Sequence, residues 1–204
     1  MRRFAVFLAI AAGICAGAQA AVTTDAKQAP AGAYQVETRH TQVLFAIAHL
    51  ELTDYHGRFE KVSGTLNFNP NAPEKSSLSV TVDTASANVM SSELLGEIVG
   101  ADVLDAAAFP TATFTSTAIE RTGPTSGRMT GELTLHGVTR PVAFDVTFNG
   151  GAQSPMGAAT YLLGFRATTV IHRGDFGLDK MRWTGFVGGD VTLTIEALFQ
   201  KQKG

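Results

Sequence analysis

The fold is decided by residues 130–148, T-G-E-L-T-L-H-G-V-T-R-P-V-A-F-D-V-T-F. Within them, Thr130–Leu135 and Val142–Phe148 alternate apolar and polar side chains. Because successive side chains of a strand point to opposite faces, this period of two is typical of a half-buried β-strand. The residues between, His136–Pro141, carry glycine and proline and predict a tight hairpin.

The same alternation recurs along most of the chain. Further alternating segments are Thr65–Asn69, Leu78–Asp83, Thr111–Thr115 and Val191–Phe199, and further turn signals are Asn69–Pro73, Thr122–Gly127 and Asn149–Gly151. We count about eight strands, plus a short first one at Tyr34–Thr38. Each strand has one polar face, which favours an antiparallel sheet with one side in water.

One segment has a different period. Ser91–Asp105 places apolar residues three and four positions apart, which predicts a short amphipathic helix capped by Ser91 or Ser92. Gly96 and Gly100 are its weak points, since each costs about 1 kcal/mol relative to alanine. This helix is also the candidate cover for Val43–Leu50, which is apolar on both faces.

Eight antiparallel strands and one helix can form a sandwich or a closed barrel. The short, regular connections favour an up-and-down barrel. We therefore expect an all-β fold, an eight-stranded antiparallel barrel with one short helical insertion. The interior of such a barrel is either filled by side chains or holds one small ligand, and the alternation alone leaves both alternatives open.

The N-terminus has the pattern of an export signal. Arg2 and Arg3 precede the apolar run Phe4–Ala16, and Ala18-Gln19-Ala20 matches the site that signal peptidase cuts. We expect residues 1–20 to be removed and the protein to be periplasmic or secreted. Residues 21–33 are rich in Ala, Thr, Gln and Pro without periodicity and predict a flexible leader.

The mature composition argues against several functions. Removing residues 1–20 leaves 184 residues with fourteen Lys and Arg against eighteen Asp and Glu, a formal charge of −4. A nucleic-acid partner, which needs a basic face, is therefore not expected. Cys15 is removed with the signal, so no thiolate metal site or cysteine nucleophile remains.

No catalytic or metal-binding constellation stands out. The chain has no G-x-S-x-G elbow, phosphate-binding loop or dinucleotide-binding glycine motif. His40, His49 and His56 have spacings that fit zinc poorly. We expect neither enzymatic activity, nor a metal, nor a cofactor other than a bound lipid.

Several motifs, in a shared order, carry a resemblance. His40–His49 is similar to H-S-x-V-x-F-x-I-x-H, Gly131–Val142 to G-x-L-T-x-x-G-V-T-x-P-V, and Arg173–Gly177 to R-x-D-F-G. Val187–Val191 resembles V-G-D-x-V with Gly189 as an extra residue, which indicates a bulge in the last strand. Residues 34–200 thus resemble a lipid-binding barrel domain of the YceI-like family, exported lipocalin-like barrels associated with polyisoprenoid binding.

The resemblance implies a central apolar tunnel that holds a polyisoprenoid, an isoprenoid quinone or a fatty-chain amphiphile. The protein would act as a periplasmic carrier or sequestering protein, with transient contact to a membrane or a membrane protein. Its oligomeric state stays open. The expected lipid-binding residues are Phe45, Ile47, Phe59, Leu66, Phe68, Phe114, Leu133, Phe144, Phe165 and Leu193.

Two alternatives remain. The first is an exported structural or stress-response barrel whose core is filled and holds no ligand. The second is an enzyme that acts on an isoprenoid at the barrel mouth, for which His40, Arg173 and Asp175 are the only charged cluster that the sequence offers.

Overall fold

The computed structural model describes residues 21–155, 160–179, 183 and 185–202, so the expected signal peptide, residues 1–20, lies outside the described residues. The strands are β1 Gly32–Val36, β2 Gln42–His49, β3 Thr53–Phe59, β4 Val62–Phe68, β5 Ser77–Asp83, β6 Ala87–Val89, β7 Thr111–Arg121, β8 Ser126–Leu135, β9 Val138–Gln153, β10 Tyr161–His172 and β11 Val187–Lys201. The helices are α1 Ser92–Val99 and the 3₁₀ turns η1 Ala26–Gln28, η2 Pro73–Lys75, η3 Thr84–Ser86 and η4 Arg173–Phe176.

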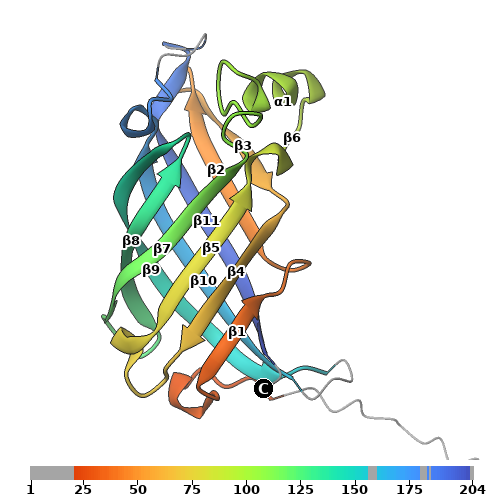
Figure 1. Ribbon diagram of the computed structural model, residues 1–204. Helices are drawn as coiled ribbons and strands as arrows, with labels where there is room; N and C mark the ends of the chain where they lie inside the picture. The colour runs from red at the N-terminus through yellow and green to blue at the C-terminus, as the bar shows by residue number, and fades with distance from the viewer. Residues whose placement is uncertain (1–20, 156–159, 180–182, 184, 203–204) are drawn as a thin grey trace, which may run out of the picture.

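These strands form a closed, eight-stranded antiparallel barrel (Figure 1). Three of the eight barrel strands are each interrupted once and consist of two segments: β1 with β2, β3 with β4, and β5 with β6. Both β1 and β2 pair with β11. In turn, β4 pairs with β1 and β3 with β2, while β5 pairs with β4 and β6 with β3. The pairing of β1 with β11 closes the ring that runs through β4, β5, β7, β8, β9 and β10. The expected eight-stranded barrel with one short helix is confirmed.

The interruptions are held by polar side chains. Between β1 and β2, the Thr41 hydroxyl accepts from the Leu198 N–H at 3.0 Å and lies 3.2 Å from the Leu198 carbonyl oxygen, to which it donates. Between β3 and β4, the Lys61 N–H donates to the Ser86 hydroxyl at 3.0 Å. Such side chains replace the missing backbone partners, so each barrel strand stays continuous through its break.

The predicted hairpin around His136 is tighter than the sequence suggested. Leu135 pairs with Val138, so the turn consists of His136 and Gly137 alone. Both have positive φ, 51° and 74°, as in the two-residue turns whose twist matches that of the flanking strands. The residues up to Pro141 belong to β9.

The turn predicted at Asn149–Gly151 is wrong. Strand β9 continues through these residues to Gln153, and its register against β10 shifts at Gly164 and Phe165. Gly150 has a φ of 143° and lies so close to Thr23 that a Cβ would come within 3.0 Å of the Thr23 carbonyl oxygen. The glycines therefore serve a bulge and a close backbone approach, which share their sequence signal with a turn.

Helix α1 lies across one end of the barrel, beside β6 (Figure 1). The Ser91 hydroxyl caps it by accepting the Leu94 N–H at 3.3 Å, and the helix ends at Gly100. Leu94 and Ile98 line the barrel interior. The helix thus covers an opening of the barrel, here named the α1 end, rather than the outer face of β2 as we expected.

The N-terminal segment lies at the opposite end, here named the β1 end (Figure 1). Residues 21–33, expected to be a flexible leader, pair with the barrel at Thr23 and Gly151 and enter β1 at Gly32. Ala29 is buried, and the Tyr34 hydroxyl donates to the Pro30 carbonyl at 2.7 Å. Backbone pairing and one small buried side chain make these contacts, and neither produces a periodic sequence pattern.

In the described part of the chain, no helix has both the length and the apolar character needed to cross a membrane.

Candidate functional site

A cavity of about 760 Å³ lies inside the barrel. Every strand except β6 contributes side chains to its wall, and α1 contributes Leu94 and Ile98. The volume falls within the range of small-molecule sites, about 300–1,000 Å³. Native interiors contain few voids larger than a water molecule, so a hollow of this size is a feature of the fold rather than loose packing.

The ten residues that we expected to contact a ligand all line this cavity: Phe45, Ile47, Phe59, Leu66, Phe68, Phe114, Leu133, Phe144, Phe165 and Leu193. The strand register explains the agreement. Phe114 pairs with Val80 on one side and Leu133 on the other, and all three side chains share the inner face. For Phe114 and Leu133, the alternation therefore fixed the direction, because directly paired residues point to the same side of a sheet.

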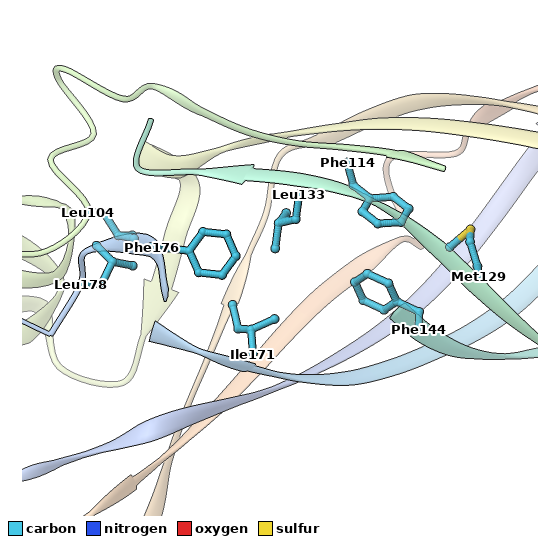
Figure 2. Packing of buried hydrophobic residues seen from close by; sticks show 8 residues of the cluster. All are labelled: Leu104, Phe114, Met129, Leu133, Phe144, Ile171, Phe176 and Leu178. Atoms are coloured by element: carbon cyan, nitrogen blue, oxygen red, sulfur yellow. The ribbon is translucent and has the colours of Figure 1, made fainter. Parts of the chain in front are cut away.

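Most of the cavity wall is apolar. Near the α1 end, Figure 2 shows Phe176 beside Leu133 and Ile171, while the Phe114 and Phe144 rings meet edge to face with their centroids 5.1 Å apart. The buried residues of this cluster are Leu104, Phe114, Met129, Leu133, Phe144, Ile171, Phe176 and Leu178.

A second buried cluster lies toward the β1 end. It consists of Ala29, Tyr34, Leu66, Phe68, Phe148, Leu163 and Phe199. Tyr34 and Leu163 are fully buried but do not line the cavity, whereas Phe68, Phe148 and Phe199 do. Apolar side chains thus bound the cavity toward both ends of the barrel.

Polar side chains interrupt this wall at both ends, and those at the β1 end are Ser76, Glu120, Arg121, Thr125 and Ser126. His49, Thr53 and Tyr55 line the cavity where β2 meets β3, and Arg173 lines it from η4. The Tyr55 hydroxyl is buried and has no hydrogen-bond partner among the described residues. Neither Thr53 nor Tyr55 is recognisable as a site residue from the sequence, because neither breaks a simple alternation of apolar and polar residues.

Arg173 is a buried cation. Only 7% of the residue is exposed, and its guanidinium donates to the carbonyls of Leu178 (2.6 Å), Gly188 (2.8 Å) and Val187 (3.1 Å). These bonds join η4 to the start of β11. Within the described ranges, no carboxylate forms an ion pair with it.

The charged cluster that we considered for an enzyme is not assembled. His40 lies between β1 and β2, where its Nδ1 is 2.7 Å from a Glu37 carboxylate oxygen and the Glu37 N–H donates to the Leu198 carbonyl. Arg173 binds the other end of the fifteen-residue strand β11, at Val187 and Gly188. A strand of that length separates the two side chains by tens of ångströms.

The local partners of Glu37 account for its electrostatics. Burial acts to raise the pKa of the Glu37 carboxyl, but hydrogen bonds from His40 and Arg39 outweigh it, and the pKa is lowered. The partners of His40 are thus structural ones within its own turn. Across the described residues, no three potential metal ligands converge. The absence of a bound metal in the protein stays a prediction.

The fold and the cavity define a class of protein, a closed eight-stranded barrel with a hollow apolar interior. The model of the YceI-like domain matches residues 34–199, and the chain belongs to this family. The last strand also carries the irregularity indicated by Gly189, since the register of β11 against β2 shifts between Val187 and Val191.

Sequence relatives include UPF0312 proteins of Pseudomonas. One from Pseudomonas putida is 38% identical over 179 residues, which covers 87% of this chain and 92% of the relative. Another from Pseudomonas savastanoi pv. phaseolicola is 40% identical over 156 residues, which covers 76% of this chain and 80% of the relative.

Solved structures show the same architecture. BcnA of Burkholderia cenocepacia matches with a TM-score of 0.70 at 27% identity, over 80% of this chain and 98% of that one. The YceI protein of Campylobacter jejuni matches with a TM-score of 0.68 at 27% identity, over 77% and 91%. A polyisoprenoid binding domain from Saccharophagus degradans matches with a TM-score of 0.64 over 83% and 98%, and at 14% identity it shows the fold alone.

Proposed function

We propose that this chain binds one long apolar lipid inside the barrel. The candidate ligands are a polyisoprenoid, an isoprenoid quinone or a fatty-chain amphiphile. The observation that carries the proposal is the cavity of about 760 Å³ with a nearly continuous apolar wall. The likeness in fold to a domain described as polyisoprenoid binding supports the same assignment.

The energetics of burial favour such a ligand. Each CH₂ group transferred from water to an apolar site contributes about 0.8 kcal/mol, so ten buried carbons give roughly 8 kcal/mol before the costs of ordering. The length also fits. The twelve residues of β10 extend for roughly 40 Å at 3.3 Å per residue, and a tilt of about 40° leaves a barrel roughly 30 Å long.

The alternative of a filled, ligand-free core is less favourable. An interior that evolved only to be packed would leave a hollow of this size at a cost, since the free energy of a cavity rises by about 24 cal/mol per Å³ in well-studied core substitutions. A bound chain removes that cost by restoring contacts along the wall.

We further propose that the protein works as an exported, non-catalytic carrier or sequestering protein. The signal-like pattern of residues 1–20 supports export. Intact-mass measurement of the periplasmic fraction tests this part. A mature chain that begins at Ala21 is the expected result, and a mass that retains residues 1–20 would refute it.

Organic extraction of the natively purified protein, followed by mass spectrometry, tests lipid binding. We expect one long-chain apolar lipid in near-stoichiometric amount. The Leu133→Trp variant serves as a matched control. The indole ring of the introduced tryptophan should occupy part of the cavity and reduce the amount of extracted lipid. The proposed function would be refuted if natively purified wild-type protein contained no lipid and the same protein also failed to bind added farnesol.

A further inference from the structure

The polar side chains on the cavity wall form a group at each end of the barrel, and the two groups differ in burial and charge. His49, Thr53, Tyr55 and Arg173 gather at the α1 end, and the register places them together, since His49 pairs with Val187 and the Arg173 guanidinium donates to the Val187 carbonyl. We propose, building on the lipid-binding function above, that this end holds an anionic, oxygen-rich head group such as a phosphate, with the apolar tail directed toward the β1 end.

Arg173 supplies the charge. A guanidinium has five N–H donors in a planar fork, and three of the five are used by the carbonyls of Leu178, Val187 and Gly188. One donor on each terminal nitrogen has no acceptor among the described residues. A buried cation without a carboxylate partner is costly, and an anionic ligand offsets that cost most directly.

Tyr55 supplies a second donor. Its hydroxyl is shielded from water and unpaired in the described residues, while the residue lines the same cavity. A buried hydroxyl without a partner carries a desolvation penalty. A head-group oxygen that enters this end would give the hydroxyl an acceptor.

His49 and Thr53 extend the donor set toward solvent. The two residues form a cross-strand pair, and both are exposed at the end of β2 and β3. No described hydrogen bond involves either side chain, so a threonine hydroxyl and an imidazole N–H are both available to an anionic oxygen.

The β1 end offers a poorer site. There Arg121 donates to the carbonyls of Gly123 (2.8 Å) and Pro124 (3.1 Å) and is exposed to solvent. Glu120 beside it is the one carboxylate among the described residues on the cavity wall. An exposed cation next to an acid binds an anion weakly, so the charge on the wall favours the α1 end.

A pair of probes with the same chain tests the inference. Farnesol and farnesyl phosphate differ only in the head group, and the affinity of each is to be measured by displacement of the neutral dye N-phenyl-1-naphthylamine. We expect wild-type protein to bind farnesyl phosphate about tenfold or more tightly than farnesol, as one charge-assisted contact in a buried site implies. Arg173→Gln should abolish this preference, and Arg128→Gln, an exposed site on β8 away from the cavity, should leave it unchanged.

Tyr55→Phe keeps the inference falsifiable if Arg173→Gln fails to fold, since it removes one oxygen and no described contact. We expect it to weaken farnesyl phosphate binding several-fold and farnesol binding less. Equal affinity of both probes for wild type, or a preference that survives Tyr55→Phe in full, would overturn the inference while leaving lipid binding intact. A preference lost in Arg121→Gln instead would place the head group at the β1 end and overturn it as well. Failure of both probes to bind would refute the proposed function itself.

Discussion

The ring of Phe45 lies over the backbone of Gly57, its cross-strand partner, in the space that a side chain at residue 57 would occupy. Glycine at this position therefore lets the Phe45 ring pack against the backbone of β3, so that the ring does not fill the cavity. We predict that Gly57→Ala drives the ring into the cavity and destabilises the protein by about 1–3 kcal/mol. The free energy of unfolding, measured by urea titration, should fall. The amount of lipid extracted from the variant should fall as well.

Gly96 provides the control for that change. It lies in α1, and a Cβ there meets no atom within 4 Å. Gly96→Ala should raise the free energy of unfolding by up to about 1 kcal/mol through helix propensity alone and leave the lipid content unchanged. Equal behaviour of the two alanine variants would contradict the role given to Gly57.

Leu133→Trp tests whether the interior has spare volume. The side chain belongs to the buried cluster near the α1 end and also lines the cavity, so the larger ring can extend into the hollow when no lipid is present. We predict a free energy of unfolding of lipid-free protein within about 1 kcal/mol of wild type, together with loss of bound lipid. A close-packed interior would instead lose about 1–3 kcal/mol from overpacking, and that result would favour a filled core.

Tyr34 should make the fold sensitive to alkali. Burial, followed by the charge of Tyr161, raises its pKa from 10.0 to about 12. Because the folded state favours the neutral phenol, this contribution to stability is complete below pH 10 and is lost as the pH rises through about 12. The loss amounts to at most about 2–3 kcal/mol. Tyr34→Phe should show a smaller decline in unfolding free energy between pH 10 and 12, and identical pH profiles would disprove the assignment.

The β2–β3 turn contains strain that glycine should relieve. Leu50 and Glu51 both have positive φ, 55° and 57°, at the two central positions where Asn-Gly is usual. The left-handed conformation costs a residue with a side chain about 1–2 kcal/mol. We predict that Glu51→Gly raises the free energy of unfolding by up to about 1 kcal/mol in urea titrations, whereas Glu51→Ala, which keeps the strain, gives no gain.

The inward direction of the strand residues was predictable from the sequence. Phe114 and Leu133 belong to strictly alternating segments, and the pleat then leaves only one choice of face once the apolar side is assigned to the core. The position of the helix was predictable for a similar reason, because the spacing from Leu94 to Ile98 and a capping serine are local signals. Both features depend on neighbours in sequence.

Features that depend on long-range packing were not predictable. Asn149–Gly151 has the composition of a turn, yet it forms a bulge because Thr23 packs against Gly150 from the far N-terminus. The polar residues of the cavity wall were missed or misplaced for the same reason. Arg173 was grouped with His40, although β11 separates them, and Tyr55 gains its significance only from the empty space beside it.

The central claim is that the barrel interior is the place of a long apolar ligand. The most direct measurement is a crystal structure of the protein purified from its own periplasm without added lipid. We predict continuous, elongated electron density in the cavity, in contact with Phe114 and Leu133 along its course. A cavity that holds only discrete waters, or that has collapsed around repacked side chains, would contradict the account.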